Sequence, residues 1–122
     1  MKNFGFIGFG SMSKMIINCM IKYANIHPNQ IYVTRRDKNR LHEINDIFED
    51  VITVNTLHDV MVNADIIFIC VKPMEIKAIL PEIASLVTDK THIISLAGSV
   101  SISNIQSVLS CKITKYMWNY II

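Results

Sequence analysis

Residues near the start of the chain have the types and spacing needed to bind a phosphate group: Gly8-Phe9-Gly10-Ser11-Met12-Ser13. This stretch follows the pattern G-x-G-x-x-G/A, with a serine in the third glycine position. Gly8 permits a tight turn, and Gly10 lets the backbone approach a pyrophosphate without an intervening Cβ. A small residue such as Ser13 lets a helix pack against a strand. Because such turns also serve chain geometry alone, the neighbouring elements must decide between the two interpretations.

A pair of arginines lies about 20 residues further on, after a short apolar run. At that place in a dinucleotide-binding unit, an Asp or Glu binds the adenosine ribose 2′-OH of NAD. This chain has Thr34-Arg35-Arg36 instead, and a guanidinium can hold a 2′-phosphate through two charge-assisted hydrogen bonds. We therefore predict NADP (NADPH) as the cofactor in preference to NAD. The alternative is that Arg35 and Arg36 form a solvated face before the next helix.

The elements on either side of the glycine stretch favour phosphate binding. An apolar run over residues 4–7 predicts a buried strand, and residues 11–23 carry apolar side chains at helical spacing. A helix that starts at the glycine turn directs its unpaired N–H groups and the positive end of its dipole at the phosphate. We therefore interpret the stretch as part of a cofactor site.

The rest of the chain predicts strands that alternate with helices. Strands are expected over residues 31–33, 51–54, 66–71, 91–96 and 112–117. Helices are expected over residues 37–48, in a short segment after Asn55 or Thr56, and over residues 74–80, 81–87 and 101–109, with Pro81 dividing the third from the fourth. This alternation predicts an α/β fold, a doubly wound parallel sheet in three layers, within one domain that spans residues 1–122.

Lys72-Pro73 follows the most apolar of these strands. The carboxyl ends of the strands form the ligand crevice of a doubly wound sheet, which would bring this dipeptide to the cofactor. Proline is also common in the first turn of a helix, so a purely structural role stays open.

Composition and charge exclude several other classes of protein. The hydrophobic fraction of 51% suits strands buried on both faces of a parallel sheet. No apolar run reaches the roughly 18 residues that a membrane span needs, and no signal peptide is evident, so we expect a cytoplasmic protein. A net charge of +2 gives no support for nucleic-acid binding. Cys19, Cys70 and Cys111 are odd in number and widely spaced, so we expect buried thiols rather than disulfides. Neither these cysteines nor the histidines have the spacing of metal ligands, so we expect no metal site.

Four stretches together resemble the N-terminal dinucleotide-binding domain of the pyrroline-5-carboxylate reductase family, which includes late-competence proteins. They are GFIGFGSMSKMII at residues 5–17, YVTRR at 32–36, ADIIFICVKPMEI at 64–76 and HIISLAGSVSISNI at 92–105. The run that ends in Val71-Lys72-Pro73 is the most specific. The resemblance implies a Rossmann-type fold and an oxidoreductase of proline biosynthesis, which uses NAD(P)H to reduce the C=N bond of 1-pyrroline-5-carboxylate to give L-proline.

The resemblance also implies which residues bind the cofactor. Residues 8–13 would hold the pyrophosphate and residues 34–36 the adenosine ribose or its phosphate, while the nicotinamide side would be lined by Val71, Lys72, Pro73, Ala97, Gly98 and Asn119. No catalytic residue is assigned. The chain departs from the family at Ala97-Gly98-Ser99, where the family has Ala-Ala-Gly, and at Trp118 and Tyr120, which replace a proline and a threonine.

The resemblance further implies that the family's C-terminal helical dimerisation domain is absent. The isolated chain would then be incomplete for catalysis, and apolar area left exposed would favour a homo-oligomer. Two alternatives stay open. One is a non-catalytic or regulatory module that binds NADP(H), and the other is a different NADP-dependent oxidoreductase with the same first domain, such as a hydroxyacid dehydrogenase or a deazaflavin-dependent reductase.

Overall fold

The computed structural model describes residues 2–96 and 112–115. Their elements follow the predicted alternation. In chain order they are β1 (Phe4–Ile7), α1 (Ser11–Tyr23), the 3₁₀ helix η1 (Pro28–Gln30), β2 (Ile31–Thr34), the 3₁₀ helix η2 (Lys38–Arg40), α2 (His42–Ile47), β3 (Ile52–Thr53), α3 (Leu57–Asn63), β4 (Ile66–Ile69), α4 (Pro73–Ala84), β5 (His92–Ser95) and β6 (Lys112–Lys115).

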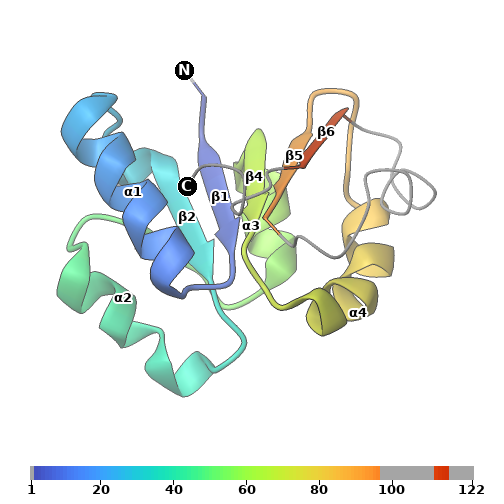
Figure 1. Ribbon diagram of the computed structural model, residues 1–122, viewed down its shortest axis with the longest axis horizontal. Helices are drawn as coiled ribbons and strands as arrows, with labels where there is room; N and C mark the ends of the chain where they lie inside the picture. Colours follow the sequence, from blue (N-terminus) through green and yellow to red (C-terminus); the bar gives the residue numbers. More distant parts are fainter. Residues whose placement is uncertain (1, 97–111, 116–122) are drawn as a thin grey trace.

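The described strands form one parallel sheet in the order β3-β2-β1-β4-β5-β6. Along the chain the strands run outward from β1 to one edge, and then outward from β4 to the other (Figure 1). This order is that of a Rossmann fold, and the order reverses between β1 and β4. The predicted doubly wound α/β fold is therefore confirmed.

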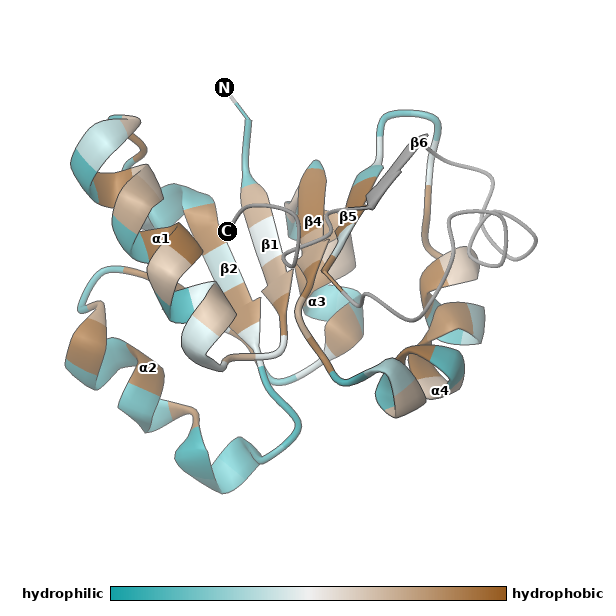
Figure 2. Ribbon diagram, in the orientation of Figure 1, coloured by the Kyte–Doolittle hydropathy of each residue, from teal (hydrophilic) through white to brown (hydrophobic). Residues whose placement is uncertain are grey.

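Helices cover both faces of the sheet and give the structure three layers. Figure 1 shows α1 and α2 on one side and α4 on the other. The first face is built around Phe6, Ile17 and Val33, and the second around Val60, Ile69 and Ile76. The strands are mostly apolar because they are buried between these two layers, while polar residues lie on the outer faces of α2 and α4 (Figure 2).

Strand β1 lies at the centre of the sheet, and its side chains alternate between the two faces. Phe6 packs on the α1 side, where its ring stacks on that of Phe68 with 4.7 Å between centroids. Gly5 and Ile7 face α3 and α4. A Cβ added to Gly5 would lie 2.5 Å from Val60 Cγ1 and 2.9 Å from Ala64 Cβ. The glycine therefore lets α3 pack close to the sheet.

Two helices differ from their predicted bounds. The helix expected over residues 37–48 is divided into η2 and α2. The Asp37 carboxylate accepts a hydrogen bond from the Asn39 N–H. The first turn is tightened into a 3₁₀ helix by hydrogen bonds to the third residue back, such as that from the Leu41 N–H to the Lys38 C=O.

The break expected at Pro81 was wrong. Helix α4 continues through Pro81, because Ile76 and Leu80 before it and Ile83 after it are buried against the same cluster.

One thiol also departs from its expected burial. Cys19 is exposed, because it lies about 200° around α1 from the buried Ile17. Cys70 is partly buried. The predicted helix at 101–109 and the third cysteine, Cys111, lie outside the described residues. In the described part of the chain, no helix combines the length and the apolar character that crossing a bilayer requires.

The close packing at Gly5 predicts that Gly5→Ala destabilises the fold. Strain from overpacking, about 1–3 kcal/mol, exceeds the gain of about 0.4–1 kcal/mol from a less flexible unfolded chain, so the free energy of unfolding should fall by about 1–2 kcal/mol. Urea denaturation measures this change. Gly10→Ala is the matched control, because an added Cβ there meets no atom within 4 Å. Equal stabilities for the two variants would contradict the prediction.

Candidate dinucleotide site

The carboxyl ends of the central strands are tied together by backbone hydrogen bonds. The N–H of Gly8 donates to the C=O of Thr34 over 2.9 Å, and the N–H of Cys70 donates to the C=O of Ile7 over 2.8 Å. These bonds bring the segments that follow β1, β2 and β4 to one edge of the sheet, at the point where the strand order reverses. Ligands of doubly wound sheets bind in the crevice at this point.

The glycine turn after β1 has the geometry of an anion site. Gly8 has a φ of 101°, and a Cβ there would lie 2.7 Å from the backbone oxygen of Cys70. Ser13 is fully buried, and its hydroxyl donates to the C=O of Gly8 over 2.9 Å, which closes the turn. Gly10 faces open space, so the absence of its Cβ leaves room for a ligand. Helix α1 begins there without a side-chain cap or an acidic residue in its first turn, which suits an anion.

Phe9, between the two glycines, anchors the turn to the rest of the structure. It is 9% exposed, and its ring meets that of Phe48 edge to face at 6.4 Å. Lys14 Nζ lies 5.5 Å from the centroid of the Phe9 ring and Arg35 Cζ lies 5.7 Å from it. The contact with Arg35 couples the glycine turn to the end of β2.

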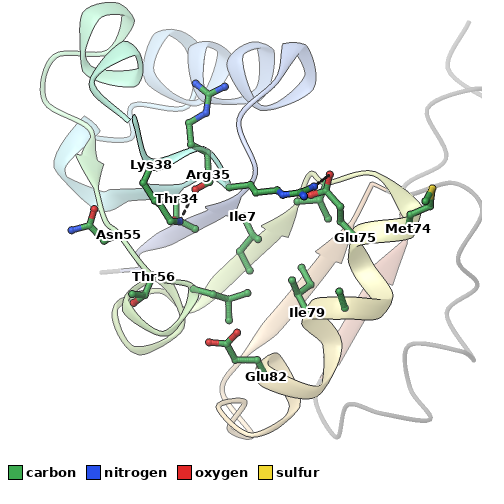
Figure 3. Close-up of a pocket in the computed structure, with 14 residues that line it drawn as sticks. Ile7, Thr34, Arg35, Lys38, Asn55, Thr56, Met74, Glu75, Ile79 and Glu82 are labelled. Carbon is green, nitrogen blue, oxygen red and sulfur yellow. Dashed lines mark hydrogen bonds and ion pairs between the residues drawn. The ribbon is translucent and has the colours of Figure 1, made fainter. Parts of the chain in front are cut away.

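A cavity of about 700 Å³ opens beside these strand ends (Figure 3). Its walls come from β1, from the ends of β2 and β4, from the start of α3 and from one side of α4. The residues that line it are Ile7, Thr34, Arg35, Arg36, Lys38, Asn55, Thr56, Leu57, Val71, Met74, Glu75, Ala78, Ile79 and Glu82. Apolar residues such as Ile7, Val71 and Ile79 form much of the wall, whereas charged groups stand around them. Such a cavity suits a flat apolar ring that carries a polar, charged substituent.

The two arginines after β2 occupy different environments. The Arg35 side chain is 13% exposed, and its Nη1 donates to the C=O of Arg40 over 3.4 Å and lies 3.9 Å from the Glu43 carboxylate. Together with the contact to Phe9, these partners direct it away from the cavity toward α2 (Figure 3). The Arg36 side chain is 85% exposed and reaches Glu75 on α4, with 3.7 Å between Nη1 and Oε1. Arg36 is therefore the arginine whose guanidinium remains accessible to a ligand.

Lys38 adds a third cation at the same edge. Its Nζ donates to Thr34 Oγ1 over 3.0 Å and to the C=O of Arg35 over 2.5 Å. Partial burial lowers the pKa of this amine from its ordinary value. Thr34 and Lys38 thus form a polar corner of the cavity beside the arginines (Figure 3).

The structure brings most of the predicted site residues together. Thr34, Arg35, Arg36 and Val71 line the cavity, and residues 8–13 form the adjacent turn. Lys72 is the N-cap of α4 and Pro73 its first residue, as the structural interpretation of this dipeptide expected, and neither lines the cavity. Ala97, Gly98 and Asn119 lie outside the described residues.

Sequence reasoning missed several residues that line the cavity. Asn55 and Thr56 lie two and three residues after the end of β3, so the rule that ligands gather at carboxyl ends of strands could have found them. Glu75 lies in the first turn of α4 and Glu82 in its third, and a local pattern does not distinguish them from solvated residues of an amphipathic helix. Among residues 2–96, no group of three His, Cys, Asp or Glu side chains could hold a metal ion.

Comparisons with known proteins agree with this architecture. The model of a family described as "NADP oxidoreductase coenzyme F420-dependent" matches residues 3–99. The chain belongs to this family. The fold and the family of this chain support a nicotinamide cofactor. The predicted resemblance to pyrroline-5-carboxylate reductases is confirmed by similar proteins of that name.

Pyrroline-5-carboxylate reductase of Escherichia coli (strain K12) is 31% identical over 108 residues, which cover 88% of this chain and 40% of that protein. The structure of a pyrroline-5-carboxylate reductase from Coxiella burnetii superposes with a TM-score of 0.85 and 32% identity over 95% of this chain and 43% of its own. Plasmodium falciparum pyrroline carboxylate reductase, with NADP bound, has a TM-score of 0.73 and 19% identity, covers 89% of this chain and 38% of its own, and shows the shared fold alone.

The chain therefore spans about two fifths of the length of these relatives. Cytoplasmic location and self-association stay predictions.

The environment of Cys70 predicts a pH dependence of stability. Burial raises the pKa of its thiol from 9.0 to about 11, against the opposing effect of a hydrogen bond with Ser13. Below pH 9 the thiol is protonated in both states, so the full stability is present. Between pH 9 and about 11 only the unfolded chain loses the proton, so the free energy of unfolding should fall, by up to about 2 kcal/mol.

Urea denaturation at several pH values tests this expectation, with Cys70→Ala as the comparison. The difference between the two proteins removes the contribution of tyrosines and lysines that titrate in the same range. An identical fall in stability for both proteins would contradict the prediction.

Proposed function

We propose that this chain is the NADPH-binding domain of a pyrroline-5-carboxylate reductase. The observation that carries the proposal is the cavity at the switch point, which Arg36 lines with an exposed guanidinium and which lies next to an open glycine turn. In this proposal the pyrophosphate binds the N–H groups at the start of α1. The adenine occupies the apolar part of the cavity, and the 2′-phosphate binds Arg36 and Lys38.

The two arginines have different roles in this proposal. Arg36 contacts the 2′-phosphate directly, whereas Arg35 holds the β2 end in place through Phe9, Glu43 and the C=O of Arg40. Asn55 and Thr56 line the same cavity and would provide polar groups for the ribose hydroxyls. Specificity for NADPH therefore depends mainly on one accessible guanidinium.

When bound, the reduced nicotinamide supplies a hydride to the carbon of a C=N bond. The residues of this chain bind and orient the cofactor, and proximity then provides much of the rate gain. The substrate, a small cyclic imine carboxylate, is proposed from the relatives alone. The part of the relatives that has no counterpart in this chain would supply the pocket for it.

Titration with NADPH and NADH tests the cofactor. We expect the chain to bind NADPH more tightly than NADH. Arg36→Ala should weaken NADPH binding by about ten-fold or more, because a charge-assisted contact is worth about 1.5–3 kcal/mol, and should leave NADH binding almost unchanged. Arg35→Ala is the matched variant. It should lower the stability and affect both nucleotides alike. Equal losses of NADPH and NADH affinity in Arg36→Ala would contradict the proposed phosphate site.

A chimera tests the reaction. In it, residues 1–122 are followed by the part of the Escherichia coli relative that lies beyond the matched region. We expect oxidation of NADPH that depends on added pyrroline-5-carboxylate, measured by the nicotinamide absorbance, with the Escherichia coli enzyme as the positive control. A folded chimera that binds NADPH without turnover would favour the non-catalytic alternative.

A further inference from the structure

An acidic side chain occupies the cavity opposite the proposed phosphate site. Glu75 lies in the first turn of α4, across the cavity from the end of β2, and Figure 3 shows it facing the side on which Thr34 and Lys38 lie. Its carboxylate Oε1 is 3.7 Å from Nη1 of Arg36. An anion of the protein therefore already lies beside the guanidinium that a 2′-phosphate would need.

The other cations near the cavity have different partners. Arg35 lies near Glu43 and against Phe9, and Lys38 donates to Thr34 and to the backbone. Within the described residues, Glu75 is the one carboxylate within 4 Å of the Arg36 side chain. Glu82 lines the same cavity further along α4, and no described cation lies within 4 Å of its carboxylate. The two glutamates therefore differ in whether they contact the phosphate-binding cation.

The pair of Arg36 and Glu75 contributes little to the stability of the fold. The Arg36 side chain is 85% exposed and that of Glu75 is 30% exposed, and ion pairs in such positions stabilise proteins weakly. Glu75 is favourable at the start of α4 because of the helix dipole, but a carboxylate anywhere in this turn would have the same effect. Its position inside the cavity is therefore significant mainly for what binds there.

We propose that Glu75 is a specificity-determining residue, which competes with the adenosine 2′-phosphate for Arg36 and so reduces the preference for NADPH over NADH. This inference rests on the proposed function of the cavity. A ligand with a 2′-phosphate must displace the carboxylate from the guanidinium before it can pair with Arg36. A ligand with a 2′-hydroxyl leaves the ion pair intact. The glutamate thus weakens the binding of the phosphorylated nucleotide selectively.

Two nucleotide fragments isolate this effect from the nicotinamide half of the site. Adenosine 2′,5′-bisphosphate carries the 2′-phosphate, and 5′-AMP lacks it. Calorimetric titration of the full chain with each fragment at low salt should show that Glu75→Gln binds the bisphosphate about two- to five-fold more tightly than wild type, the range expected for an exposed ion pair. The affinity for 5′-AMP should not change. Glu82→Gln is the matched control: it removes a carboxylate that does not contact Arg36, so it should leave the ratio of the two affinities unchanged.

A double variant tests whether Glu75 acts through Arg36. Arg36→Ala should weaken bisphosphate binding. The double variant, which also carries Glu75→Gln, should bind the bisphosphate no more tightly than Arg36→Ala alone. Urea denaturation of each variant establishes that all remain folded.

Three results would overturn the inference. If wild type binds the bisphosphate tightly and Glu75→Gln does not change this affinity, Glu75 does not determine specificity, and the proposed cofactor site still stands. An equal gain for both fragments, or a gain that persists without Arg36, excludes competition for that guanidinium. Failure of wild type to bind either fragment removes the proposed cofactor site, and this inference with it.

Discussion

The contact between the carboxyl ends of β1 and β4 is the constraint on which the rest of the structure depends. Gly8 leaves β1 with a positive φ, and its missing side chain lets the backbone pass close to Cys70 and Val71. Any other residue would meet the carbonyl oxygen of Cys70 and strain the turn. Because this approach is so close, the glycine turn, the end of β2 and the start of α4 lie at the same edge of the sheet, where the strand order reverses.

Much of the fold could be predicted from the sequence because its strands are short, apolar and separated by recognisable turns. The bounds of α1 agreed with the structure, since a glycine turn precedes it and its apolar spacing stops at Tyr23. The helix break predicted at Pro81 was wrong. Proline removes a hydrogen bond within the helix, but this rule does not consider the packing that holds α4 on the sheet. Cys19 was misjudged for a similar reason, since apolar neighbours in sequence do not share its side of the helix.

The arrangement of the candidate site could be predicted where it depends on the backbone and on strand ends, and less so where it depends on side-chain direction. Sequence reasoning placed Arg35 and Arg36 together because they are adjacent. The structure separates them, since neighbouring residues after a strand point in different directions, one toward Phe9 and the other toward α4. The ion pair of Arg36 and Glu75 links residues that are 39 positions apart (75 − 36), and no local sequence pattern indicates such a contact.

The strand order also determines when the cavity forms during folding. Phe4 pairs with Ile31 on one side and with Ile66 on the other, so the second pairing must close a loop more than twice as long. Loop closure of this kind slows the folding of parallel sheets. A nascent chain that has emerged only as far as β3 can form one half of the sheet, but it lacks the wall supplied by β4 and α4. A nucleotide that binds in this cavity, as proposed, would therefore stabilise only those folding intermediates in which both halves of the sheet have already joined.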